Sequence, residues 1–217
     1  MRQVTPTDAP GLARLINEVW DHNLNPERIA SVGLDSNRVT VVADSGSDVI
    51  GFADGFMTAT SDGVPRWEVD LLAVDARYRG RGIAQRLIAA SVDAGRLAGA
   101  AVARALVQIG NAPSLRAFQR CGFTPEAATC ELTVSGAACD ERLTAPLGAH
   151  LISVRTYTYS GIWIEGRLSL EALRCARSIR TRYAWDVAGA VIPEGTFDQT
   201  PEGYAVVGRY RWLHLSL

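Results

Sequence analysis

The sequence contains no lysine, and all 22 of its basic residues are arginine. This excludes a P-loop nucleotide site, whose glycine-rich turn ends in lysine followed by serine or threonine. The four cysteines form no Cys-x-x-Cys pair and lie near no group of histidines. We therefore expect neither a metal site nor a disulfide framework, and reduced thiols of this kind are typical of a cytoplasmic protein.

Long apolar runs and an excess of one charge are also missing. No stretch reaches the ~18 apolar residues of a membrane span, and the segment Met1–Pro6 lacks the apolar core of a signal peptide. The net charge is −1, so there is no overall electrostatic attraction to nucleic acid or to an anionic membrane. We expect a cytoplasmic protein that binds neither. Its 217 residues suffice for one good-sized domain or two small ones.

A glycine-rich turn follows an apolar stretch in the first half of the chain. The stretch Val69–Val74 predicts a strand, and the run Arg79–Ala84 (Arg-Gly-Arg-Gly-Ile-Ala) leads into a predicted helix. Unpaired N–H groups at a helix start, together with the helix dipole, favour a phosphate anion. Gly80 and Gly82 let the backbone approach such an anion closely, and the neighbouring arginines add positive charge. The turn therefore predicts a phosphate-binding site.

A second motif comes after the alternating run Val102–Val107, which predicts a strand. It consists of Asn111–Ser114 (Asn-Ala-Pro-Ser) and Phe118–Phe123, which ends in Gly-Phe. The two motifs resemble those of the GNAT-type N-acetyltransferase superfamily, with signatures Arg/Gln-x-x-Gly-x-Gly/Ala and Asn-x-x-Ala/Ser. The glycine-rich turn fits every fixed position of the first signature. The resemblance covers roughly residues 1–136 and not the remainder.

The resemblance implies acetyl-CoA as co-substrate and no metal. In this family the turn holds the pyrophosphate, the backbone of the preceding strand pairs with the pantetheine arm, and one strand N–H faces the thioester oxygen. The residues that inherit a role in binding the co-substrate are Leu72, Ala73, Val74, Arg79, Gly80, Arg81, Gly82, Ile83, Ala84, Asn111, Ser114 and Phe118. Asn111 is equally well explained as a helix cap, and Ser114 as a replacement for the family's small residue.

Two carboxylates are candidate catalytic residues, because the attacking amine must lose a proton. Strict alternation along the strand puts Glu68, Asp70, Leu72 and Val74 on one face. Glu68 stands where several relatives carry their general base, and Asp70 lies one repeat closer to the turn. Either acts directly or through water, particularly if burial raises its pKa. The alternative is that both are solvated acids that balance nearby arginines.

Phe118 departs from the family pattern. Many members have tyrosine at this position, which protonates the leaving thiolate, and phenylalanine has no proton to donate. The proton would then come from solvent, from Cys121 or from a residue that the motifs do not identify.

The expected fold is α/β (α+β), with a mixed, mostly antiparallel sheet flanked by helices in GNAT topology and a small C-terminal α+β extension. We divide the chain into an acyltransferase domain (1–136), a linker (137–148) and a small α+β domain of unknown role (149–217). The last part is too small to be stable alone, so we expect it to dock onto the first domain or to mediate a homodimer.

Three elements are expected in this last part. They are a hairpin of Leu151–Tyr159 and Gly161–Glu165, a helix over Leu168–Tyr183 capped by Ser169, and a long closing strand over Tyr204–Leu217. No second glycine-rich turn occurs there, so the chain is not an intact tandem acetyltransferase.

The leading hypothesis is an N-acetyltransferase that passes an acyl group from acetyl-CoA to an amine by direct attack in a ternary complex. The alternative is a catalytically weak acyl-CoA-binding or sensor module whose C-terminal part carries the output. A small-molecule amine is favoured over a protein acceptor. By resemblance, the acceptor contacts the regions Trp20–Ile29 and Gly55–Val64.

Overall fold

The computed structural model describes residues 1–20, 22–32, 35, 37–46 and 48–217. Across them, eleven strands join one sheet in the order β1-β2-β3-β4-β5-β11-β7-β10-β9-β8, and β6 pairs with β11. The strands are β1 (Arg2–Gln3), β2 (Arg38–Ser45), β3 (Asp48–Ala59), β4 (Pro65–Val74), β5 (Val102–Gln108), β6 (Thr124–Pro125), β7 (Cys130–Ser135), β8 (Ala149–Arg155), β9 (Ser160–Gly166), β10 (Val187–Pro193) and β11 (Ala205–Ser216).

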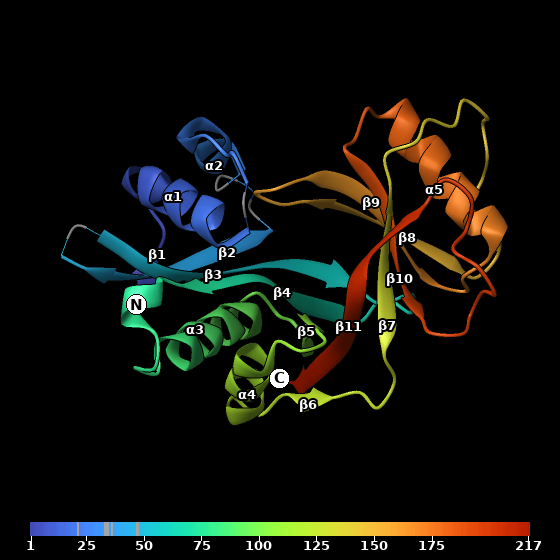
Figure 1. The fold of residues 1–217 in the computed structure, drawn as a ribbon. Coiled ribbons are helices and arrows are strands. Elements are labelled where there is room, and N and C mark those ends of the chain that lie inside the picture. Colours follow the sequence, from blue (N-terminus) through green and yellow to red (C-terminus); the bar gives the residue numbers. More distant parts are fainter. Residues whose placement is uncertain (21, 33–34, 36, 47) are drawn as a thin grey trace.

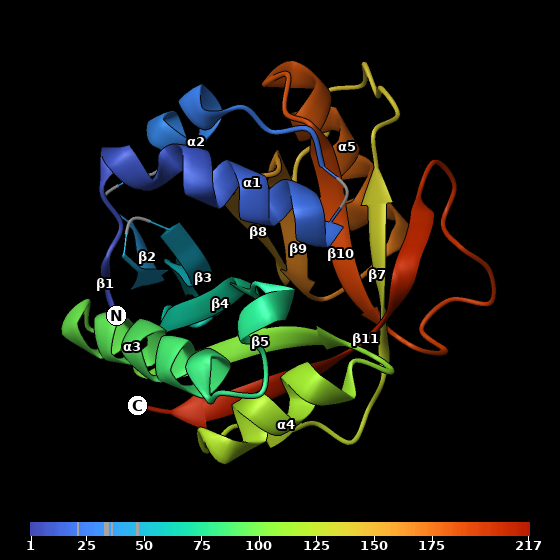
Figure 2. The ribbon, with the colours of Figure 1, turned by 60° about the vertical axis from the view of Figure 1, so that its left-hand side comes forward.

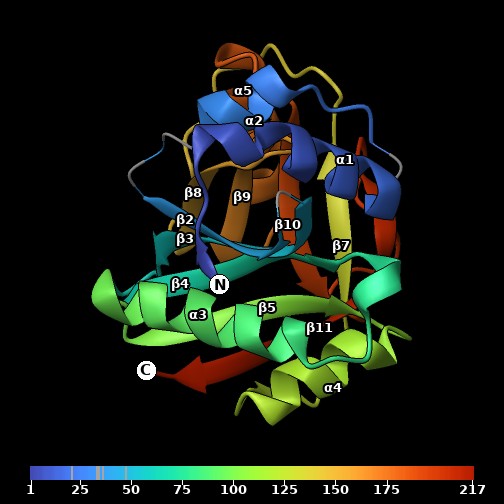
Figure 3. The same ribbon diagram turned by 90° about the vertical axis from the view of Figure 1, so that its left-hand side faces the viewer.

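Five α-helices lie on the two faces of this sheet: α1 (Ala9–Trp20), α2 (Pro26–Val32), α3 (Ile83–Leu97), α4 (Ala112–Arg120) and α5 (Leu170–Arg182). In the first half, α1 and α2 cover one face and α3 and α4 the other (Figure 1). In the second half, the strands β7 to β10 cross the direction of the first-half strands β4 and β5, and α5 packs against their outer face (Figures 2 and 3). The expected mixed, mostly antiparallel sheet with flanking helices is therefore confirmed. No helix of the described residues is long and apolar enough to span a bilayer.

Local sequence explains the core of the first half. α1 buries Leu12, Leu15 and Ile16, which recur every three or four residues and so form one apolar stripe. On the opposite face, Trp67 of β4 is fully buried beneath α3. A Cβ at Gly95 of α3 would lie 2.5 Å from the Trp67 ring, so only glycine lets the helix approach this strand so closely.

A β-bulge in β4 corrects the predicted alternation. Gly55 pairs with Val69 but Ala53 pairs with Leu72, so β4 carries one more residue than β3 across this step. The extra residue turns the strand, as bulges do, and exchanges the two faces beyond it. Leu72 consequently packs beside the cluster of Val69, on the α3 side, whereas Leu71 and Ala73 pack toward α1. The prediction that Glu68, Asp70, Leu72 and Val74 share one face is therefore wrong beyond the bulge.

The last strand completes the middle of the sheet. β11 runs antiparallel to β5 on one side and to β7 on the other, and its Leu213 is fully buried. The expected docking of the C-terminal part onto the first part is thus confirmed and takes the form of strand pairing. The domain division at 137–148 and the homodimer stay predictions.

The predicted elements of this part are also confirmed: β8 and β9 form an antiparallel hairpin, and Ser169 caps α5 by accepting a hydrogen bond from the Ala172 N–H. β10 was not predicted. Its sequence Val-Ala-Gly-Ala-Val-Ile-Pro contains small residues that carry little strand signal.

Residues 136–204 lie between β7 and β11 and form an inserted region, which repeats part of the arrangement of the first half. β9, α5 and β10 form a parallel strand–helix–strand unit, as β4, α3 and β5 do, and each unit is preceded by an antiparallel strand. The two units differ in how the first strand joins the helix. Residues 75–82 make a long turn before α3, whereas only residues 167–169 lie between β9 and α5. The second unit therefore lacks the glycine-rich turn. Its strands β9 and β10 instead contribute residues to the lining of a cavity.

Candidate active site

β4 and β5 separate halfway along their length. They pair in parallel from Arg66 with Val102 to Val69 with Ala105, and no pairing continues beyond Val69 among the described residues. From Leu72 to Val74, β4 remains paired with β3 on its other edge. The backbone of the predicted pantetheine-binding segment is therefore unpaired on the edge that faces β5.

The glycine-rich turn lies at the far end of this opening. Gly80 and Gly82 have φ angles of 76° and 72°, the left-handed conformation that glycine adopts without strain. Within the described parts of the chain, the N–H groups of residues 80–85 find no hydrogen-bond acceptor. Arg79 Nε donates to the Val74 carbonyl oxygen at 3.0 Å, which ties the turn to the end of β4. The turn thus presents a row of free donors at the start of α3, beside the exposed Arg81.

A cavity of about 790 Å³ begins at the opening between β4 and β5. Its lining from the first half includes Glu68, Asp70, Leu72, Arg104, Asn111, Ser114 and Phe118. Trp20, His22, Phe56 and Thr58, from the two regions predicted to contact the acceptor, also line it. The remaining wall comes from β7 to β11, with Ile152, Tyr159, Trp163, Glu165, Val191, Tyr210 and Trp212 among its residues.

Sequence reasoning did not identify the wall formed by the inserted strands. Ile162 and Ile164 of β9 pack under α5, so the alternate residues Trp163 and Glu165 face the cavity. The alternation was readable in the sequence, but nothing local indicated which face would meet β4 and β5.

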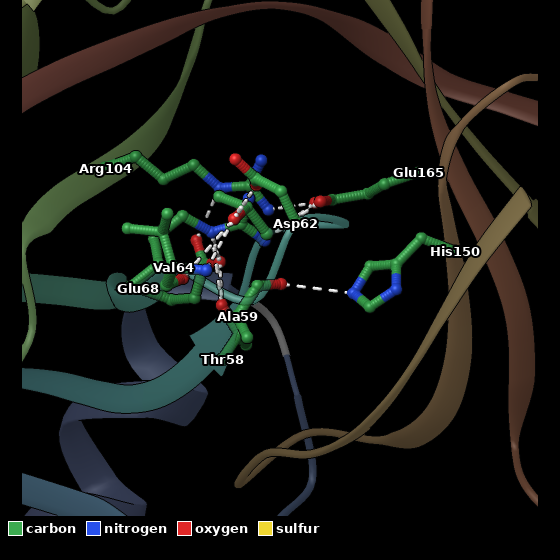
Figure 4. Close-up of polar contacts among 10 residues, drawn as sticks. Thr58, Ala59, Asp62, Val64, Glu68, Arg104, His150 and Glu165 are labelled. Carbon is green, nitrogen blue, oxygen red and sulfur yellow. Dashed lines mark hydrogen bonds and ion pairs between the residues drawn. The ribbon is translucent and has the colours of Figure 1, made fainter. Parts of the chain in front are cut away.

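Glu68 is buried and held by three hydrogen bonds. Its carboxylate accepts from Arg66 Nε, Arg104 Nε and Thr58 Oγ1, each at 2.7 Å. Glu165 of β9 completes the group by pairing with both arginines. Its Oε2 lies 2.9 Å from Arg66 Nη2, and its pairing with Arg104 can be followed in Figure 4. Two glutamates and two arginines therefore neutralise one another and join β4 and β5 to the inserted hairpin.

Asp70 has a different environment. It lines the same cavity, and its Oδ2 is shielded from solvent with no hydrogen-bond partner among the described residues. Burial raises the pKa of Asp70 to about 6; the charge of Glu68 adds to the rise and that of Arg38 opposes it. Arg38 itself is engaged by the buried Asp54. Asp70 is thus a carboxylate with a pKa near neutrality and with an oxygen that can still accept a hydrogen bond.

The residues of the second motif lie as follows. Asn111 Oδ1 accepts from the Ser114 N–H at 3.2 Å, so its side chain acts as a helix cap at the cavity edge. Phe118 is buried and packs edge-on against Phe123, with ring centroids 5.0 Å apart. Tyr159 and Tyr210, which the motifs did not indicate, also line the cavity, and burial raises the pKa of both phenols.

Comparison with protein families gives one match: the model described as the acetyltransferase (GNAT) family matches residues 9–123. No curated protein sequence matches the chain. The matched region contains both motifs, the β4–β5 opening and both candidate carboxylates.

Solved structures with similar folds include three that are informative. A GCN5-related glucosamine N-acetyltransferase region of a fungal multi-domain GH3 β-N-acetylglucosaminidase has a TM-score of 0.62 at 12% identity, over 99% of this chain and 38% of that chain. A GCN5-related N-acetyltransferase from Sphaerobacter thermophilus has a TM-score of 0.57 at 15% identity, over 99% and 94%. YncA from Salmonella typhimurium, solved with its cofactor acetyl-CoA, has a TM-score of 0.54 at 19% identity, over 60% and 82%.

At these identities the similarity is one of fold. Two of the three neighbours cover 99% of this chain, so the inserted region is part of the shared architecture. The chain spans only 38% of the length of the fungal protein.

Proposed function

Because this chain belongs to the acetyltransferase (GNAT) family, we propose that it is an N-acetyltransferase that passes the acetyl group of acetyl-CoA to an amine by direct attack in a ternary complex. One observation carries the proposal. The free donors at the start of α3 and the unpaired edge of β4 lead directly into a cavity that contains Asp70. An anion site, a slot for an extended arm and a base thus lie in the order that the reaction requires.

The chain supplies three groups for binding acetyl-CoA. The free N–H groups of residues 80–85 and the positive end of α3 hold the pyrophosphate. The unpaired backbone of Leu72–Val74 pairs with the pantetheine arm as an added strand would. Ser114 and Phe118 of α4 line the cavity beside this slot.

Asp70 is the general base in this proposal. As the amine nitrogen forms its bond to the thioester carbonyl carbon, Asp70 accepts the proton that the nitrogen loses, directly or through water. A backbone N–H of β4 stabilises the negative charge that develops on the carbonyl oxygen as this bond forms. The C=O bond then re-forms as the C–S bond breaks and the thiolate leaves. The thiolate takes its proton from solvent, because Phe118 has none to give. Glu68 is unsuited to the base role, since Arg66, Arg104 and Thr58 already occupy its oxygens.

The test measures CoA release from acetyl-CoA with a panel of amines, and acetyl-CoA binding by calorimetry. Gly82→Val should weaken binding at least tenfold, about 1.4 kcal/mol, because the side chain fills space that the pyrophosphate needs. Gly195→Val is the matched control, since Gly195 has a similar φ of 80°, open surroundings and no place in the site. Equal affinity in both folded variants would refute the assigned pyrophosphate site. Binding without turnover of any amine would instead favour an acyl-CoA-binding module.

A further inference from the structure

The cavity carries a charge pattern that restricts its acceptor. In the described part of the lining the acids are Glu68, Asp70 and Glu165, and two of these are neutralised by the arginines they contact. Arg66 and Arg104 together balance Glu68 and Glu165. Asp70 alone is left without a partner on Oδ2 in the described part of the chain. The described lining of the cavity therefore offers one binding site for a cation.

Among the residues that the structure describes, no further acid lines the cavity to balance a second ammonium group. Removing a charged amine from water without a partner costs several kcal/mol. The existing glutamates do not offer one, because rotating either toward a ligand would leave Arg66 and Arg104 short of one counter-charge. Polyamines and polycationic aminosugars are thus disfavoured, and a monoamine fits.

The wall formed by β7 to β10 is mainly apolar and aromatic, whereas polar side chains such as Gln108, Asn111 and Ser114 line the side near β5 and α4. Trp163 of β9 lies over Gly189 of β10, where a Cβ would come within 2.5 Å of the ring, and its ring is 5.9 Å from that of Tyr159. Trp212 of β11 also lines the cavity, and its ring centroid lies 3.9 Å from Arg104 Cζ. Leu132, Val134, Ile152, Val154 and Val191 fill the intervening wall. The wall formed by β7 to β10 favours an apolar acceptor body and holds few polar side chains for a sugar's hydroxyl groups.

We propose that the acceptor is a monoamine on an aromatic or other apolar body, with its amine at Asp70 and its body against the inserted strands beside Trp163. This rests on the proposed function and goes beyond it by naming the substrate class. It also gives the inserted region 136–204 a role, since β8 to β10 supply the surface that recognises the acceptor.

The experiment compares three acceptors on the full chain: 2-phenylethylamine, glucosamine and spermidine. We expect kcat/KM for 2-phenylethylamine to exceed that for each of the others at least tenfold. Trp163→Leu should raise KM for 2-phenylethylamine about tenfold and leave KM for acetyl-CoA unchanged. Trp185→Leu is the matched control, because Trp185 stacks on Tyr183 and is not part of the cavity lining.

The outcomes separate the two levels of the argument. Preferred turnover of glucosamine or spermidine would overturn the substrate class and support the acetyltransferase activity. Failure to acetylate all three, and a wider panel of amines, with acetyl-CoA binding retained, would overturn the proposed function and the substrate class with it. The comparison of acceptors needs only the unmodified protein, so it stands even if Trp163→Leu fails to fold.

Discussion

Replacing Asp70 by asparagine should stabilise the fold while slowing the reaction. The folded protein raises the pKa of this carboxyl from 3.8 to about 6, so the folded state binds its proton more tightly than the unfolded state does. Between these two values, the unfolded chain has lost the proton and the folded chain keeps it. The contribution of Asp70 to stability therefore falls as pH rises from 4 to 6 and is constant above.

The size of the effect follows from the shift. A difference of about two pKa units corresponds to roughly 3 kcal/mol of destabilisation at pH 7.5. Asparagine removes the charge but keeps a desolvated polar group, which costs ~1–2 kcal/mol. We expect Asp70→Asn to raise the free energy of unfolding by ~1–2 kcal/mol at pH 7.5. At pH 4 the contribution of the pKa shift falls to ~0.5 kcal/mol while the cost of the desolvated amide remains, so the variant should be less stable there by ~0.5–1.5 kcal/mol.

Urea denaturation at both pH values measures this difference. Asp198→Asn is the control, because Asp198 is exposed and should change stability little at either pH. If Asp70→Asn is no more stable than the unmodified protein at pH 7.5, or differs from it equally at both pH values, the carboxylate is not desolvated and the reasoning fails.

The same variant should lose activity. With a pKa of about 6, the ionised fraction of Asp70 rises from one-tenth at pH 5 to nine-tenths at pH 7, so kcat should rise about tenfold over this range. Asp70→Asn should lower kcat on the order of 10²-fold and abolish this limb of the pH profile. Stability gained together with activity lost would mark Asp70 as a residue kept for chemistry. A wild-type rate in Asp70→Asn, with a large loss in Glu68→Gln, would return the base role to Glu68.

Three further predictions concern the architecture. Glu165→Gln leaves Arg66 and Arg104 short of one counter-charge and should lower the free energy of unfolding by ~1–3 kcal/mol in urea; unchanged stability would mean that the pairs contribute nothing. Gly95→Ala should cost ~1–3 kcal/mol, because its Cβ meets the Trp67 ring at 2.5 Å, and wild-type stability would show that the ring has room to move. Truncation after Gly136 removes β11 and uncovers β5, so the fragment should aggregate in size-exclusion chromatography; a soluble monomer with full activity would contradict this.

Features that depend on neighbours along the chain could be predicted from the amino-acid sequence. The glycine-rich turn is recognisable because Gly80 and Gly82 adopt positive φ angles where a strand passes into a helix. The strands over Val69–Val74 and Val102–Val107 and the helix between them follow from the periods of strand and helix. The hairpin, helix and closing strand of the last part are likewise confirmed, because each has a pattern that repeats within a few residues.

Which of the two carboxylates is free to act depends on contacts that form in the folded protein. Glu68 and Asp70 look alike in sequence, and their difference comes from Arg104 on β5, Glu165 on β9 and an extra residue in β4. The position of β11 between β5 and β7 and the position of Trp163 at the cavity likewise depend on the tertiary structure. Local periodicity can be read from residues that are adjacent in the sequence. Strand partners and charge compensation instead depend on groups far apart in the chain, so they exist only once the sheet has assembled.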